Sequence, residues 1–209
     1  MCETQSLKTV QQERYALQEF IKDVDGVVRE YSSESEILLH LKPALERLVS
    51  SPSSVPAKAF TPRKNRFAMN LIQMPEDEAY SIIGGVWHPG QTTPIHDHLT
   101  WAMIGVYEGE EREALFRRTD DGSNPKRAKI QQVSERVHKK GHVTVLGHSG
   151  IHRVDNISLK PTSAYTSTAA ISGTLNATAT IHLRAKSADS SQDTVMFYMI
   201  QRNSNQLTP

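Results

Sequence analysis

The chain has 209 residues, a formal net charge of +1 at pH 7 and one cysteine, Cys2. This length suits one domain, or one domain with a helical appendage. The near balance of 24 basic and 23 acidic side chains argues against nucleic acid or an anionic membrane as a partner. A lone cysteine excludes an internal disulfide. With no apolar run long enough to span a membrane and no signal-peptide pattern at the start, we expect a cytoplasmic protein, as a monomer or a homodimer.

Two amphipathic helices are predicted near the beginning of the chain. Apolar side chains recur every three or four positions over residues 7–31, and a second such pattern starts after Ser33. Pro43 is predicted to break the second helix into two pieces, because an interior proline removes a backbone hydrogen bond. Residues 50–62, rich in Ser and Pro, are predicted to form a linker.

From Arg66 onward, short apolar and β-branched segments alternate with turn signals such as Asp121-Gly122. Such a pattern favours an all-β sandwich or barrel over alternating strands and helices. Residues 158–177 are predicted to be a long loop or a weak extra hairpin. We expect one domain, in which residues 1–62 form a helical segment and residues 63–209 a barrel. The predicted strands are 67–73, 80–87, 93–97, 101–108, 112–118, 128–134, 142–147, 151–157, 178–184 and 194–201.

Histidines in two distant segments predict a metal centre. His96 and His98 stand two residues apart, so on a strand both imidazoles point to the same side and can bind one divalent metal. The third ligand must come from another strand, and His152 is the obvious candidate. Four other histidines lack such motif residues around them and are predicted to lie on the surface or in turns: His88, His138, His142 and His148. Of these, His148 is kept as an alternative third ligand.

The glycines around these histidines carry a resemblance to a known fold. Gly90, five residues, His96-x-His98, ten residues and Gly109 resemble the first cupin motif. Gly141, ten residues, His152, three residues and Asn156 resemble the second. The resemblance implies a mainly β fold, the cupin double-stranded β-helix or jelly-roll barrel, with the N-terminal α-helices packed outside.

The first cupin motif also carries a glutamate, which should fall near Ala102 or Met103 and is missing here. A three-histidine cupin without this glutamate resembles the cysteine dioxygenase family, which uses ferrous iron and O₂ to oxidise small thiols. The strings TPIHDHLTWAMIGVYEG and GIHRVDN are particularly similar to members that act on 3-mercaptopropionate. The resemblance implies Fe(II) held by three ligands: His96, His98 and His152.

The same resemblance suggests residues around the substrate. Mercaptopropionate-type enzymes carry a Ser-His-Tyr relay, and the matching positions here are Thr180, His182 and Arg184. His182 and Thr180 are therefore the candidate catalytic residues, while Arg184 is suited to binding a carboxylate. Three further residues are candidate substrate contacts: Met69, Met103 and Trp101. Met69 stands where cysteine-type enzymes have an arginine, and Met103 stands where they have a cross-linked cysteine.

We therefore expect a non-haem Fe(II)-dependent dioxygenase whose partners are a small-molecule thiol and O₂, with a sulfinate as product. Two alternatives remain open at the level of the sequence. One is a three-histidine cupin dioxygenase that cleaves a non-thiol substrate such as a diketone or a phenol. The other is a metal-binding cupin without turnover, acting as a sensor or structural module.

Overall fold

The computed structural model describes residues 15–51, 54–64, 66–123 and 127–158, and beyond them the backbone of strands β8 to β12. The helical elements are α2 (Leu17–Glu30), α3 (Glu34–Ser50) and the short 3₁₀ helix η1 (Ala57–Phe60). The strands up to the second cupin motif are β1 (Ala68–Gln73), β2 (Tyr80–Trp87), β3 (Ala102–Glu108), β4 (Glu110–Arg118), β5 (Arg127–Lys139), β6 (Val143–Leu146) and β7 (Ile151–Asn156). The later strands are β8 (Thr166–Gly173), β9 (Ala179–Ile181), β10 (Arg184–Ala185), β11 (Asp193–Met196) and β12 (Met199–Gln201).

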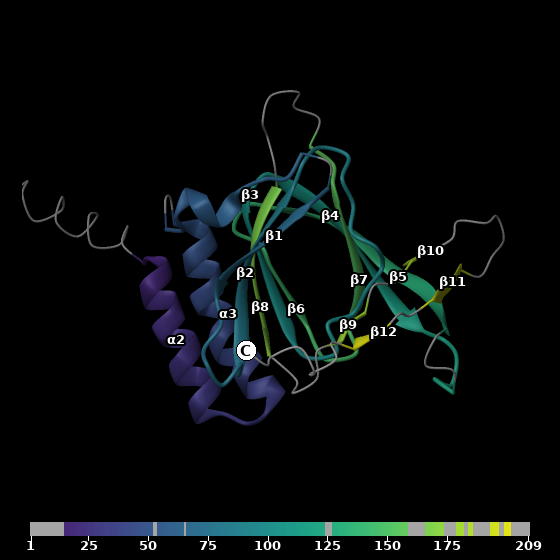
Figure 1. The fold of residues 1–209 in the computed structure, drawn as a ribbon, viewed down its shortest axis with the longest axis horizontal. Coiled ribbons are helices and arrows are strands. Elements are labelled where there is room, and N and C mark those ends of the chain that lie inside the picture. The colour runs from purple at the N-terminus through teal and green to yellow at the C-terminus, as the bar shows by residue number, and fades with distance from the viewer. Residues whose placement is uncertain are drawn as a thin grey trace, which may run out of the picture.

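Two five-stranded sheets form the body of the protein (Figure 1). The first has the order β1-β2-β8-β3-β6 and the second the order β10-β11-β5-β4-β7, while β9 and β12 pair with each other. Neighbouring strands in both sheets are antiparallel. The mainly β architecture with helices outside it confirms the predicted fold class.

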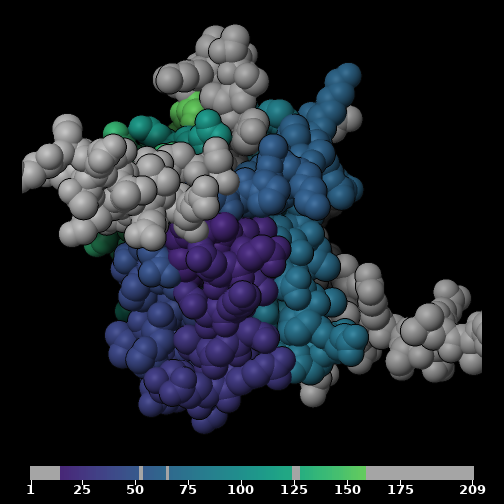
Figure 2. Space-filling view, turned by 90° about the vertical axis from the view of Figure 1, so that its left-hand side faces the viewer, coloured from purple at the N-terminus to yellow at the C-terminus, as the bar shows by residue number. Residues whose placement is uncertain are grey.

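Helices α2 and α3 cover the outer face of the first sheet, as the space-filling view shows (Figure 2). Phe20 and Leu45 from the helices share one buried cluster with Met103 from β3. The approach is close at Gly105, where an added Cβ would lie 2.6 Å from Val49 Cγ1. No helix in the described ranges is both long and apolar enough to cross a membrane.

Pro43 does not break the second helix, contrary to the prediction. Helix α3 continues through it from Glu34 to Ser50. Pro43 and Leu39 are both exposed, so the carbonyl of Leu39, which loses its amide partner at Pro43, stands on the solvent side of the helix. Water can satisfy that carbonyl, and the buried face of the helix keeps its packing.

The predicted linker contributes to the core. Ala59 and Phe60, from η1, are buried in the same cluster as the helices. Within the described residues the predicted first helix is α2, from Leu17 to Glu30, and residues 7–14 of that prediction lie outside the described residues. Helices, η1 and first sheet thus share one hydrophobic cluster.

Residues 166–173, predicted to be loop or weak hairpin, form a central strand. Strand β8 pairs with β2 on one side and with β3 on the other. Its sequence, TSTAAISG, has Ile171 as its one large apolar residue, which is why its hydrophobic pattern was weak. Threonine and the pairing available on both sides favour a strand there despite the weak pattern.

Two glycine substitutions should change stability in opposite directions. An added Cβ at Gly84 would lie 2.2 Å from the carbonyl oxygen of Ala59, so Gly84→Ala should destabilise the protein by about 1–3 kcal/mol. Gly26, inside α2, has no atom within 4 Å of that position, and Gly26→Ala should stabilise the protein by about 0.5–1 kcal/mol. Urea unfolding of both variants measures this, and an unchanged midpoint for Gly84→Ala would contradict the close contact.

Candidate metal centre

Three histidines come together where the segments of the two cupin motifs lie side by side. His96 and His98 lie in the loop between β2 and β3, and His152 lies in β7. The Nε2 atom of His152 is 3.2 Å from that of His96 and 3.1 Å from that of His98. The three ring nitrogens all lie within 4.8 Å of one another and form the single metal-binding group found among the described residues.

The loop that carries His96 is held along β7 by its backbone. His96 and His152 exchange two hydrogen bonds, each amide donating to the other's carbonyl at 2.9 and 2.8 Å. The Thr93 amide donates to the Val154 carbonyl at 2.9 Å. Residues 93–97 were predicted as a strand, but only isolated bridges at Thr92 and His96 form there. Gly90 begins this segment with φ +77°, a conformation that glycine adopts without strain.

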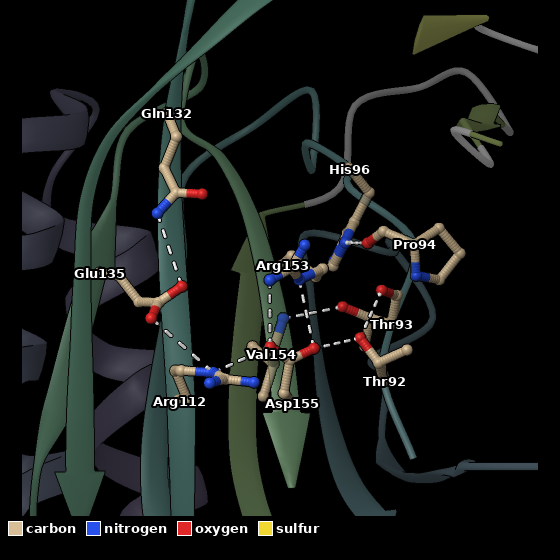
Figure 3. Close-up of polar contacts among 10 residues, drawn as sticks. All are labelled: Thr92, Thr93, Pro94, His96, Arg112, Gln132, Glu135, Arg153, Val154 and Asp155. Atoms are coloured by element: carbon tan, nitrogen blue, oxygen red, sulfur yellow. Dashed lines mark hydrogen bonds and ion pairs between the residues drawn. The ribbon is translucent and has the colours of Figure 1, made fainter. Parts of the chain in front are cut away.

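A charged cluster on the outer side of β7 fastens the same loop (Figure 3). Asp155 accepts a hydrogen bond from the hydroxyl of Thr92. The same carboxylate accepts from Arg112 Nε and Arg153 Nη2, each at 3.2 Å. Two cations and a hydroxyl therefore hold one carboxylate that bridges the loop and the sheet.

The hydrogen bonds of two rings fix which nitrogen carries the proton. His96 Nδ1 lies 2.9 Å from the carbonyl oxygen of Pro94, and His152 Nδ1 lies 2.7 Å from Oε1 of Glu113. Both partners only accept, so both Nδ1 atoms carry hydrogen and donate. In the neutral rings the Nε2 lone pairs of His96 and His152 then face each other, an arrangement that a cation between them stabilises.

The spacing of these nitrogens fits one metal ion. A metal–imidazole bond is about 2.1 Å long, so two nitrogens on one ion are about 3.0 Å apart at a right angle and about 3.4 Å apart at a tetrahedral angle. The observed 3.1 and 3.2 Å lie within this range. Burial, followed by the nearby His152, lowers the pKa of His98 to about 4, so its ring is neutral and able to bind a metal at pH 7.

A buried carboxylate stands behind His152, and the sequence reasoning did not identify it. Glu113, in β4, accepts from His152 Nδ1 at 2.7 Å, from His138 Nε2 at 2.9 Å and from the Thr144 hydroxyl at 2.8 Å. Burial raises the pKa of Glu113, but its contacts with His152, Thr144 and His138 outweigh this effect and hold the pKa below its usual value. The available signal was two acidic residues at alternate positions, Glu113 inside the predicted strand 112–118 and Glu111 just before it.

The prediction that His138 is a surface or turn histidine is wrong. Its side chain is buried in β5, where it contacts Glu113 and stacks on the ring of His142 at 3.8 Å between centroids. The charge of Glu113 gives the imidazole a partner inside the protein, which offsets the cost of burying it. His148, by contrast, has a side chain that is 75% exposed.

The other candidate residues are spread over the structure. Met69 is exposed on β1, whereas Trp101 and Met103 are buried in the cluster that includes the helices. Thr180 lies in β9 and Arg184 in β10, so the two do not share the single strand predicted for 178–184. Strand β10 is at the opposite edge of its sheet from β7. His182 lies outside the described residues.

Replacing a ligand histidine should remove metal binding. His96→Ala, His98→Ala or His152→Ala each leaves two imidazoles, which is too few protein ligands to hold a divalent ion through dialysis. His148→Ala is the matched control, since this exposed ring lies against Glu34 and is not part of the group of three, and it should keep one metal per chain. Metal content after anaerobic loading and dialysis measures this, and full occupancy in His152→Ala would rule out His152 as the third ligand.

A second buried carboxylate makes stability depend on pH. Glu111 is 1% exposed, and its Oε2 has no hydrogen-bond partner among the described residues. Burial, followed by the charge of Glu113, raises its pKa to about 8. The folded state therefore holds a proton that the unfolded state releases near pH 4.5, and this contribution to stability is lost as the pH rises toward 8.

Glu111→Gln should remove this dependence, because the amide has no proton to lose. The stability of the variant relative to the wild-type protein should rise between pH 5 and pH 9, as urea unfolding of the metal-free proteins would measure. Glu76→Gln, at an exposed glutamate, is the control and should show no such trend. A constant difference between Glu111→Gln and the wild-type protein would show that Glu111 is already ionised at neutral pH.

Solved structures with a similar fold include several cupins. A cupin superfamily protein from Desulfitobacterium hafniense is 11% identical, with 56% of this chain and 86% of that chain covered and a TM-score of 0.39. A Klebsiella pneumoniae protein with a double-stranded β-helix domain is 12% identical, covering 57% and 81%, with a TM-score of 0.42. An oxalate oxidase is 18% identical, with 54% of this chain but only 53% of that chain covered and a TM-score of 0.40.

The match to a protein family is more specific than these likenesses in fold. The model of the family described as cysteine dioxygenase type I matches residues 50–169, more than half of the chain. The matched residues include His96, His98 and His152, whose nitrogens form the metal group. A three-histidine centre in such a cupin indicates an oxygen-using, non-haem metal dioxygenase. The chain belongs to the cysteine dioxygenase type I family.

Proposed function

We propose that this protein is an Fe(II)-dependent dioxygenase that oxidises a small thiol to a sulfinate with O₂. The observation that carries the proposal is the convergence of three imidazole Nε2 atoms without a carboxylate in the group. On an octahedral ion, three protein ligands leave up to three positions for other donors. That number suits a thiolate, a second group of the substrate and O₂.

The overall reaction needs no second reductant. A thiol and O₂ give a sulfinic acid: the O–O bond breaks, two S–O bonds form, and the sulfur supplies the four electrons that the two oxygen atoms take up. Bound iron would supply O₂ activation and favour the thiolate, because a metal competes with the proton for sulfur. The chain's own part is to keep His98 neutral through its low pKa, and to hold His96 and His152 through Pro94 and Glu113.

The residues proposed around the substrate rest on the family resemblance. His182 would hydrogen-bond the bound substrate, with Thr180 orienting it, and Arg184 would bind an acidic group. The same resemblance suggests Met69, Trp101 and Met103 as apolar contacts, but Met69 is exposed and the other two pack in the cluster that includes the helices, so their positions add no support. Since β10 and β7 lie at opposite edges of one sheet, the strand order adds no support for Arg184. Comparing acidic with neutral thiols tests whether any arginine contributes.

Oxygen uptake with a panel of thiols tests the proposal. Iron-loaded protein should consume O₂ with at least one of 3-mercaptopropionate, cysteine and cysteamine, and the product should contain two oxygen atoms from isotopically labelled O₂. His152→Ala should be inactive because it lacks the third ligand, and His148→Ala should match the wild-type protein. Uptake with a diketone or a phenol alone would favour cleavage of a non-thiol substrate, and no uptake with any compound would favour a metal-binding module.

A further inference from the structure

We propose that Glu113 is a positioning residue that sets the affinity of the centre for its divalent metal, acting through His152. The proposal rests on the metal-binding part of the proposed function and is independent of the thiol chemistry. The link of Glu113 to the centre is the 2.7 Å hydrogen bond that His152 Nδ1 donates to its Oε1.

The surroundings of Glu113 suit a carboxylate and no neutral substitute. His152 donates to Oε1, while His138 and Thr144 donate to Oε2. All three neighbours are donors, and a carboxylate has only acceptors to offer. A glutamine at this position would turn its NH₂ group toward one of these donors. Glu113 and His152 are both almost fully buried, so water cannot replace a lost partner at either group.

The charge of Glu113 distinguishes His152 from His96. Both rings donate through Nδ1, but His96 donates to a neutral carbonyl and His152 to an anion. A carboxylate behind a ligating histidine fixes the ring and makes its other nitrogen a stronger donor. Imidazole ligands are neutral, so a divalent ion would bring two positive charges into a site where His152 is buried and His96 and His98 are partly buried. Glu113 supplies a negative charge directly behind the ligand His152. The first cupin motif of this chain lacks its usual glutamate and supplies no such charge.

Strand β4 provides a matched control. Glu111 stands two residues from Glu113, on the same side of the strand, and is equally buried. No donor contacts its Oε2, and its pKa of about 8 leaves it protonated at pH 7. Glu111→Gln therefore replaces one neutral group by another at pH 7, whereas Glu113→Gln removes a charge and an acceptor. The two variants carry the same Glu→Gln change two residues apart on one strand, so a difference between them reports the charge and the hydrogen bonds that only Glu113 has.

The test is the affinity for Co²⁺ at pH 7, measured by competition with a coloured chelator. Glu113→Gln should weaken binding by about 10- to 100-fold, the usual cost of losing a partner of a metal ligand. Glu111→Gln should bind as the wild-type protein does. In proteins with labelled histidine, the proton on His152 Nδ1 should give a far-downfield resonance that Glu113→Gln loses and Glu111→Gln keeps. Equal Co²⁺ affinity for Glu113→Gln and the wild-type protein would overturn the proposal.

Thr144→Val covers the case in which Glu113→Gln does not fold. It removes one donor to Glu113 and leaves His152 and its charged partner in place. It should weaken Co²⁺ binding in the same direction but by less, and wild-type affinity would then overturn the proposal. Failure of the thiol assay with Co²⁺ affinities that follow this order would reject the proposed substrate and leave the role of Glu113 standing.

Discussion

The backbone pair between His96 and His152 is the interaction on which the metal centre depends. Each amide donates to the other's carbonyl, at 2.9 and 2.8 Å, so two residues far apart in the chain stand directly opposite each other. Side chains at such a pair leave the backbone on the same side, which brings the rings together before any ion binds. The cluster around Asp155 makes the pairing rigid from outside, and Glu113 orients one ring from inside. The backbone pairing thus sets the arrangement of His96 and His152 without a metal.

Two buried glutamates on one face of β4 differ in protonation at neutral pH, because their surroundings differ. Glu113 is surrounded by three donors and remains an anion, whereas Glu111 meets no donor at Oε2 and keeps its proton at neutral pH. Burial, followed by the charge of Glu113, raises the pKa of Glu111. A single negative charge therefore lies behind His152, although two carboxyl groups are buried there.

The strands up to β7 follow the predicted ranges, except for residues 93–97, and the three histidines lie together as expected, because glycine spacing and alternation are local signals. It fails where the outcome depends on neighbours distant in the chain. Pro43 is tolerated because the carbonyl that it leaves unpaired faces solvent. His138 is buried because Glu113, from another strand, provides an acceptor. Glu113 itself looked like one more acidic residue on a strand, and only the pairing of β4 with β5 and β7 reveals its partners.

The place of β8 has a consequence for how the protein is made. Strands β2 and β3 do not pair with each other; residues 166–173 fill the space between them, joined to β2 along eight positions. A nascent chain that ends before residue 166 holds all three histidines but leaves an open strand edge on both β2 and β3. Such edges readily pair with other chains. Synthesis must therefore pass well beyond the metal ligands before the first sheet closes, and a pause or truncation in that interval exposes the protein to aggregation.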